Sequence, residues 1–429
     1  MNNIGLLIKM SRIQQNMKQV SLAKGICSTS YLSKIENNQT IPSEDVLQLL
    51  LERLNLDYED FSTEQETEFL SNLYLLYEEA IIVRNKVEIK KKLISYNEKN
   101  FLFKDESNFY TYNLYLLRLY LIADPSGSLC KNLIIALSQM EENFDIRQKF
   151  IFHLNDGIFK FIQKDYKNAI ISFEISLKLI STFHIEDWEL ADFYNAVSLS
   201  YLSEDHILNT IDYATKSLTL YKDNLLFARA FDCYIVIGIA YKRNLNFKTA
   251  EENFLLARKI ATNFNLKSYN EIINHNLGSL LAIQGDSLKA IDYFEKSLEN
   301  SSNAEKFLLT IYSISKEYSK LNNKDMVNMW TDKGLGYISN LNGVEYKSYY
   351  YHFHIFKLLH EKDSDFESIL LNAIDHFEKT TDYHYVHKYS ILLGNKYSEI
   401  RKYKNSALSL QKAISFLYKI KSINFWEDL

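Results

Sequence analysis

Hydrophobic residues near the start of the chain recur with helical spacing. The pattern predicts a first helix with its apolar face at Ile4, Leu7, Ile8 and Ile13, a second from about Gln19 to Lys24, a third capped by Ser28, and another from Glu44 to Leu54. Gly25 permits the turn after the second helix. We count this segment as five short helices, with a turn of three to four residues between the second and the third.

A second, longer pattern repeats along the rest of the chain. Small residues recur at intervals of 41, 40 and 40 positions, and further small or aromatic residues follow each of them at fixed offsets. The four sets are Gly157/Ala169/Phe173/Ser176, Ser198/Thr210/Ala214/Ser217, Gly238/Ala250/Phe254/Ala257 and Gly278/Ala290/Phe294/Ser297. This small-aromatic-small pattern resembles tetratricopeptide repeats, whose usual period is 34 residues. The small residues let paired helices approach closely, and we expect each later aromatic to pack on the neighbouring hairpin.

The composition also favours helices. Among 429 residues there are two prolines and eleven glycines, well below the average usage of roughly 5% and 7%. Such scarcity argues against a β-sandwich, a barrel or a doubly wound α/β enzyme. We therefore predict an all-α protein with a helix-turn-helix domain at 1–61, and a right-handed tetratricopeptide-like α-solenoid of about nine hairpins at 62–429.

The charge is unevenly distributed. Residues 1–42 hold five basic side chains and one acidic one, although the whole chain has a net charge of −5. A basic head on an acidic body suggests that the head contacts phosphates. The three cysteines lie far apart, which indicates neither a disulfide framework nor a zinc site. With no signal peptide and no long apolar run, we expect a cytoplasmic protein.

Several residues of the head carry a specific resemblance: Ile4-Gly5, Arg12, Gln19, Leu22-Ala23, Tyr31-Leu32-Ser33-Lys34-Ile35-Glu36-Asn37 and Pro42. The segment resembles the helix-turn-helix of the Cro/phage-repressor family, whose third helix enters the major groove of DNA. The resemblance implies base contacts by Thr29, Ser30 and Lys34. It implies phosphate contacts by Gln19, Asn37 and Gln39, and an internal ion pair between Arg12 and Glu36.

An ordinary solvated helical bundle is the alternative interpretation of the head. Because Ser, Thr and Lys discriminate bases less sharply than an arginine bound to guanine, we expect a homodimer to supply the remaining specificity.

A helix-turn-helix head in front of a lengthened tetratricopeptide array resembles the peptide-pheromone receptors of Gram-positive bacteria, the Rap, NprR, PlcR, PrgX and Rgg group. The resemblance covers the whole chain, and the number of hairpins is most similar to the NprR members. It implies a quorum-sensing transcription regulator that binds operator DNA and is switched by a short linear signalling peptide.

The peptide would bind side chains of the first helices. Asparagine suits an extended peptide because its side chain both donates and accepts hydrogen bonds, and Asn195 and Asn276 precede two of the repeat markers. The other candidates on this predicted wall are Asp192, Asp232, Lys242, Arg243 and His275. Lys242 and Arg243 could receive a carboxylate, and either aspartate could face an amine. The alternative is that these polar residues are only solvated or satisfy helix ends.

No catalytic motif is visible, so we expect no enzyme activity, no cofactor and no metal. His384 and His387 have helical spacing, but no cysteine joins them. The segment 333–336 lacks the features of a nucleotide-binding loop, and we interpret it as a hairpin loop. Two other functions remain open. The body could sequester a phosphorelay or response-regulator protein, as Rap-like relatives do, or the chain could be an orphan phage-type repressor without a peptide ligand.

Overall fold

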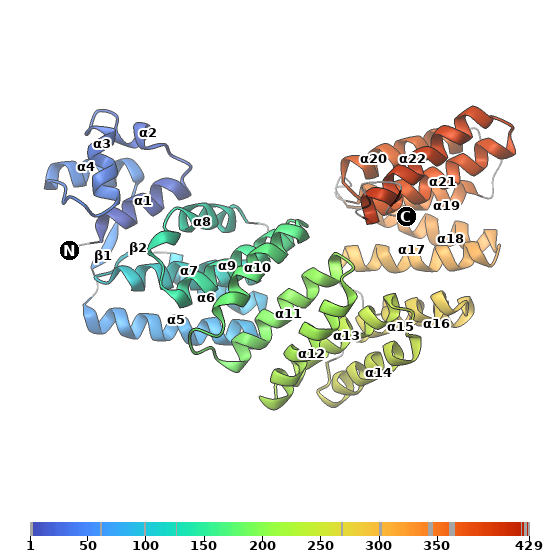
Figure 1. The fold of residues 1–429 in the computed structure, drawn as a ribbon, viewed down its shortest axis with the longest axis horizontal. Coiled ribbons are helices and arrows are strands. Elements are labelled where there is room, and N and C mark those ends of the chain that lie inside the picture. The colour runs from blue at the N-terminus through green and yellow to red at the C-terminus, as the bar shows by residue number, and fades with distance from the viewer. Residues whose placement is uncertain are drawn as a thin grey trace. The chain divides into compact units, whose positions relative to one another are not determined.

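The structure is a computed structural model that describes residues 3–60, 62–97, 100–125, 127–266, 269–299, 303–341, 346–359, 365–421, 423 and 427. Helices make up nearly all of its regular elements (Figure 1), which confirms the predicted all-α class. The chain divides into two compact units, Met1–Thr249 and Ala250–Leu429, which are described separately below.

The head contains four helices between residues 3 and 60, and their bounds agree closely with the sequence pattern. They are α1 (Ile4–Gln14), α2 (Gln19–Ala23), α3 (Thr29–Glu36) and α4 (Glu44–Leu54). The count of five helices inside the head is therefore corrected: the next helix, α5 (Thr63–Val83), begins beyond the predicted head. A short strand, β1 (Tyr58–Asp60), takes its place. Residue 61, at the predicted boundary, lies outside the described residues.

Eighteen helices follow the head in the described ranges, where the sequence predicts about nine hairpins. The first unit contains the pairs α5/α6 (Lys86–Asn97), α7 (Glu106–Ala123)/α8 (Ser128–Ser138), α9 (Ile146–Ile162)/α10 (Tyr166–Leu179) and α11 (Asp187–Ser203)/α12 (Ile207–Asp223), followed by α13 (Phe227–Arg243). Helix α14 (Phe247–Asn263) contains the boundary between the two units. The second unit continues with α15 (Asn270–Gln284)/α16 (Ser287–Leu298), α17 (Ala304–Lys320)/α18 (Lys324–Ser339), α19 (Lys347–Leu359)/α20 (Asp365–Lys379) and α21 (Tyr383–Glu399)/α22 (Tyr403–Lys421). A short 3-10 helix, η1 (Glu141–Asn143), precedes α9.

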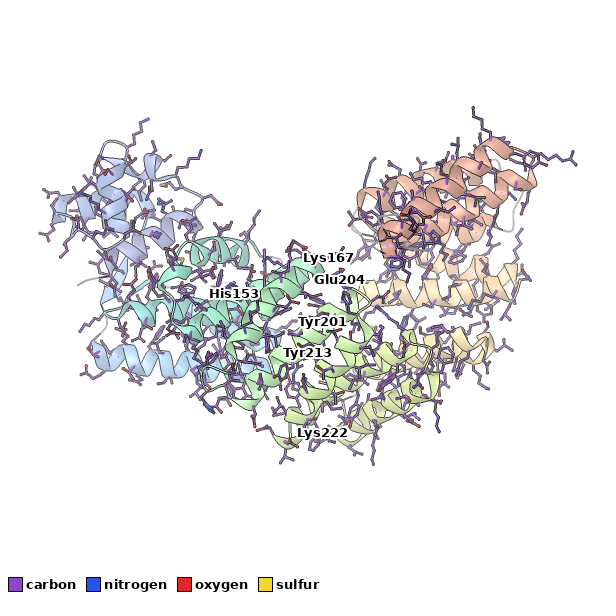
Figure 2. The ribbon with its side chains drawn as sticks, viewed as in Figure 1. His153, Lys167, Tyr201, Glu204, Tyr213 and Lys222 are labelled. Atoms are coloured by element: carbon purple, nitrogen blue, oxygen red, sulfur yellow. The ribbon has the colours of Figure 1, made fainter. Side chains whose placement is uncertain are left out.

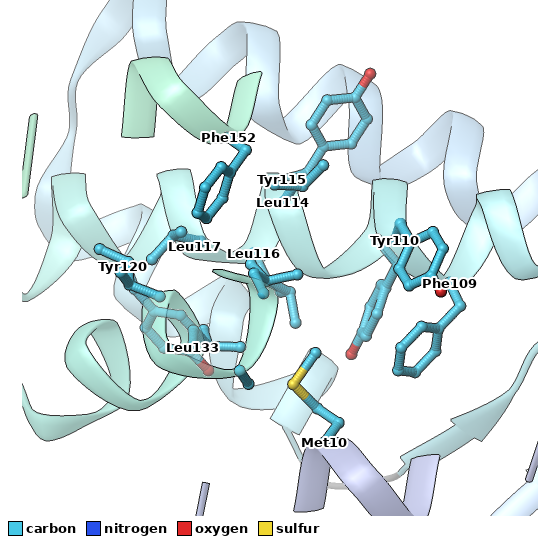
Figure 3. Packing of buried hydrophobic residues seen from close by; sticks show 14 of the residues in the cluster. Met10, Phe109, Tyr110, Leu114, Tyr115, Leu116, Leu117, Tyr120, Leu133 and Phe152 are labelled. Carbon is cyan, nitrogen blue, oxygen red and sulfur yellow. The ribbon is translucent and has the colours of Figure 1, made fainter. Parts of the chain in front are cut away.

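The head packs directly on the first hairpins of the body. Strand β1 pairs in parallel with β2 (Asn100–Leu102), an element that the sequence pattern did not predict. Met10 of α1 is buried, and Figure 3 shows it pointing into a cluster that includes Leu116 of α7 and Leu133 of α8. One continuous core therefore joins the head to the body within the first unit.

The marker glycines allow the close helix packing that the sequence predicts. The later aromatic of a repeat packs within its own hairpin as well as on the next one. A Cβ atom on Gly157 would lie 2.5 Å from the Phe173 ring, and one on Gly278 would lie 2.8 Å from the Phe294 ring. Each glycine thus admits the aromatic ring of its own hairpin. Phe173 also contacts the next hairpin, because its ring centroid lies 6.2 Å from that of Phe193.

Pairs of aromatic rings also join the two helices of one hairpin. In the α11/α12 hairpin, Tyr201 stacks on Tyr213 with their ring centroids 5.7 Å apart (Figure 2). Such ring contacts supply packing that the small marker residues cannot.

One loop prediction is wrong. Residues 333–336 lie inside α18, where a Cβ on Gly334 would fall 2.4 Å from the Phe353 ring. The glycine serves close helix packing here rather than a turn. In the described part of the chain, none of the helices has the length and apolar character needed to span a membrane.

Candidate DNA-binding face and charged cluster

Helix α3 presents its N-terminal residues to solvent. The Oγ of Ser28 accepts a hydrogen bond from the backbone N–H of Tyr31 at 3.1 Å, so the predicted cap fixes where the helix begins. Thr29, Ser30 and Lys34 are all exposed, whereas Leu32 on the opposite side is buried. The three residues assigned to base contact therefore share one open face.

A buried ion pair fixes α3 against α1. Arg12 donates from Nε and Nη2 to the two carboxylate oxygens of Glu36, at 2.5 and 2.8 Å. Its Nη1 donates to the carbonyl of Met17 at 2.9 Å. Because both side chains are nearly inaccessible to solvent, the bidentate pair sets the position of one helix relative to the other.

The three residues predicted to contact phosphates differ in how exposed their side chains are. Gln19 donates from Nε2 to Glu36 at 2.7 Å, so its amide extends the buried ion pair. Asn37 and Gln39 are exposed just after α3. The Nζ of Lys9 lies 3.4 Å from the Oδ1 of Asn37, which places a cation beside these two residues.

The first unit also contains a buried charged cluster centred on Asp192, a residue of α11. Its partners are Arg84, Arg118 and Arg229, and Asp232 joins them; we call these five residues the Asp192 cluster. Arg84 donates to Asp192 Oδ1 at 2.7 Å, and Arg118 hydrogen-bonds Oδ2.

Asp232 is the second carboxylate of this cluster and pairs with two of its arginines. Its Oδ2 lies 2.5 Å from Arg229 Nη1 and 3.8 Å from Arg84 Nη1. The side chains of Arg84 and Asp232 are 37% and 30% exposed, whereas Asp192 is only 1% exposed. A ligand could therefore reach Arg84 and Asp232, but not Asp192.

The arginines determine the protonation state of Asp192. Burial by itself would raise the pKa of this carboxyl group, but the charges of Arg118, Arg84 and Arg229 outweigh burial and lower the pKa. With three cations and two anions, the cluster carries a formal charge of +1. It therefore complements a carboxylate better than the amine that the sequence suggested for Asp192 or Asp232.

The other residues of the first unit that were predicted to bind a peptide already have partners within the protein or are half-buried. Asn195 is 2% exposed, and its Oδ1 lies 3.9 Å from the Cys233 Sγ. Arg243 donates from Nη1 to the carbonyl of Leu202 and to Asp205, at 2.5 and 2.6 Å. Lys242 is half-buried in the last turn of α13.

In the second unit, His275 and Asn276 also have partners. His275 Nδ1 lies 3.0 Å from the hydroxyl of Thr310, and Asn276 donates to the carbonyl of Ile272, one turn earlier in α15. Among the described residues, no three His, Cys, Asp or Glu side chains gather as a metal ion would need. His387 Nδ1 donates to the carbonyl of Ala413 at 2.8 Å.

Three comparisons relate this geometry to known proteins. A helix-turn-helix family model matches residues 8–61. The transcriptional activator NprA of Geobacillus stearothermophilus is 30% identical over 415 residues, which cover 94% of this chain and all of NprA. The chain belongs to the family of helix-turn-helix transcription regulators that includes NprA.

Solved structures agree with this fold at lower identity. The apo form of the quorum sensor NprR from B. thuringiensis is 18% identical with a TM-score of 0.69, covering 82% of this chain and 99% of NprR. NprR in complex with its cognate peptide NprX is also 18% identical, with a TM-score of 0.61, and covers 81% and 99% of the two chains. These structures show that the body has a solenoid fold of the NprR type. The helix-turn-helix match and the similarity to NprA support a DNA-binding regulator.

For a regulator of the NprA group, the arginines of the Asp192 cluster are the candidates that the sequence analysis missed. One signal was present: Arg118 is the lone charge in the otherwise apolar stretch 114–122. A charged residue in such a stretch needs a buried partner. Nothing in the local pattern, however, names Asp192 as that partner.

Proposed function

We propose that this regulator binds operator DNA as a homodimer through the exposed face of α3 and is switched by a short linear peptide bound on its solenoid. The observation that carries the proposal is the open face of Thr29, Ser30 and Lys34 on a helix fixed by the Arg12–Glu36 pair. A fixed helix can present side chains to base edges in one register.

The peptide half of the proposal rests on the solenoid. The similar protein NprR has been solved in complex with its cognate peptide NprX. In this chain, Arg84 is the most accessible cation of the Asp192 cluster, so we assign it to an acidic group of the peptide. To act as a switch, the peptide must bind one conformation of the dimer more tightly than the other.

The test of DNA binding is a mobility shift of the DNA upstream of the gene. The T29A/S30A variant should weaken the shift, because each lost hydrogen bond from a hydroxyl to a base costs about 0.5–1.5 kcal/mol. The control is K167A, which removes an exposed lysine of α10 (Figure 2) and should leave the shift unchanged. Equal shifts for all three proteins would contradict base contact by α3.

The test of switching adds synthetic peptides tiled over the end of any short secreted reading frame beside the gene. One peptide should create or remove the shift, and R84Q should weaken that response without changing the peptide-free shift. K92Q is the matched control, because Lys92 is a surface cation paired with Glu79 at 2.7 Å. A shift indifferent to every peptide would favour the orphan repressor. No shift at all would favour sequestration of a partner protein.

A further inference from the structure

A pit of about 250 Å³ lies on the surface of the second unit, between α20, α21 and α22. Its floor is apolar, because Ile374 and Leu393 line it and are 5% and 3% exposed. Two leucines lie at its edges, Leu371 of α20 and Leu408 of α22, and they are 48% and 58% exposed. A cavity of roughly 150 Å³ already holds benzene, so this pit can receive a leucine side chain.

The two helices that border the pit carry opposite charges. Within its bounds, α20 has four acidic residues and one lysine, whereas α22 has four lysines and no acidic residue. The second helices of the two preceding pairs, α16 and α18, each have two acidic residues and two lysines. Opposite charge on neighbouring helices therefore distinguishes α20 and α22 from α16 and α18.

The charged side chains lie next to the pit. On α22, Lys404 and Lys412 lie one helical turn on either side of Leu408. On α20, Asp375 and Glu378 line the pit itself. Lys412 pairs with Glu378 at 2.6 Å, yet these two side chains are still 39% and 43% exposed. Each of them can therefore contact a further charged group that approaches from outside.

A surface with one acidic edge and one basic edge is complementary to a second copy of itself. We call the surface formed by α20, α22 and the pit between them the α20–α22 face. A two-fold axis along the pit places α20 of each copy over α22 of the other, so each acidic edge meets a basic one. The same rotation brings the exposed leucines of each copy against the pit of the other, and every contact occurs twice, as two-fold symmetry requires.

From this arrangement we infer that the α20–α22 face joins two copies of this chain, with Leu408 of each copy in the pit of the other. The occupant is a second copy because the face itself supplies both the apolar side chain and the opposite charges. The inference rests on the proposed homodimer and names the surface that forms it. Opposite charges on facing edges would also fix how the two copies are oriented, which binding to two spaced half-sites requires.

The first experiment measures the dissociation constant of the dimer by analytical ultracentrifugation of the full-length protein, without DNA or peptide. L408D places a carboxylate in each apolar pit of the dimer, so we expect the dissociation constant to rise at least about tenfold. L288D is the matched control, because Leu288 of α16 is 69% exposed and does not line the pit. Both leucines are exposed, so each variant should keep the fold, which circular dichroism checks.

The second experiment reverses the charge of one edge at a time. K404E/K412E makes both edges of the pit acidic, and D375K/E378K makes both edges basic. Each variant alone should dimerise at least about tenfold more weakly than wild type, whereas an equal mixture should form heterodimers, because each acidic edge again meets a basic one. Recovery in the mixture would also show that both variants are folded.

K289E/K296E is the control for these charge reversals. It changes two lysines of α16 that are 73% and 51% exposed and that each pair with an aspartate. This variant should dimerise like wild type.

Three results would count against the inference. Dimers of L408D as stable as those of wild type would overturn the assignment of the α20–α22 face and leave the proposed homodimer intact. A mixture of the two charge variants that forms no heterodimer would overturn it in the same way, and would leave the face to a different protein. A wild-type protein that stays monomeric at every concentration would overturn the homodimer itself.

Discussion

Asn132 of α8 donates a hydrogen bond to the backbone carbonyl of Gln14, 2.6 Å away at the end of α1. A second contact lies at the other end of the same helix, where Asn3 donates to the carbonyls of Phe103 and Lys104 at 3.2 and 3.0 Å. Helix α1 is thus held by the body at both ends while it packs on α3 and α4 of the head. The first hairpins of the body therefore fix the orientation of α3, the helix that we propose contacts DNA.

Replacing Met10 with alanine should destabilise the head and the first hairpins together. Met10 is 3% exposed in their shared core, and removing such a side chain costs about 2–5 kcal/mol. The measurement is thermal unfolding followed by calorimetry. The control, M329A, removes a methionine that is 49% exposed and should shift stability by no more than about 0.5 kcal/mol. A head that melts in a separate earlier transition would contradict the shared core.

Replacing Glu36 with alanine should weaken both folding and DNA binding. The change leaves the Arg12 guanidinium buried without its partner, which costs about 3–5 kcal/mol. Urea unfolding measures the loss, and a mobility shift of the upstream DNA measures binding. E52A serves as the control, because Glu52 is an exposed acid of the same head whose carboxylate contacts only Gln48 among the hydrogen bonds described. Equal stability of the two variants would show that the ion pair does not organise the head.

Two glycine-to-alanine substitutions should change the free energy of unfolding in opposite directions. In G157A the new Cβ would meet the Phe173 ring at 2.5 Å, and overpacking of this kind costs about 1–3 kcal/mol. In G336A the new Cβ would have no neighbour within 4 Å, so the helix propensity of alanine should add about 0.5–1 kcal/mol. The free energy of unfolding of each variant tests the pattern. Destabilisation by both changes would show that backbone effects, not ring packing, explain the marker glycines.

The pH dependence of stability should depend on His352. Burial, and then the charges of Lys388 and His376, lower its pKa from 6.5 to about 3. Between these two pH values the unfolded chain binds a proton that the folded chain does not. Stability is therefore complete above pH 6.5 and falls as the pH decreases, by about 1.4 kcal/mol per pH unit.

H352Q should remove this contribution while keeping a polar partner for the Tyr389 hydroxyl. Urea unfolding at pH 7 and at pH 5.5 gives the comparison. Wild type should lose about 1.4 kcal/mol more than H352Q over this interval. H184Q, which replaces a histidine that is 85% exposed, should behave like wild type. The same pH dependence in wild type and H352Q would show that His352 is protonated in the folded protein.

The sequence by itself determined the helices and their order. Caps such as Ser28, apolar spacing and the scarcity of proline are local signals, and a helix closes its hydrogen bonds within a few residues. For the same reason the 40-residue period and the helix-turn-helix pattern could be predicted before the structure. The segment 333–336 is the exception, because a glycine that admits a ring and a glycine that permits a turn look alike in sequence.

Only the tertiary structure decided which distant groups meet. Arg84 and Arg118 reach Asp192 across 108 and 74 residues, and β1 pairs with a strand some forty residues later. The polar residues expected to bind a peptide were predicted by type, but whether each is free, paired or buried depends on helices packed from elsewhere in the chain. The charge of a cluster is a sum over such neighbours, and their positions are fixed by packing rather than by local sequence.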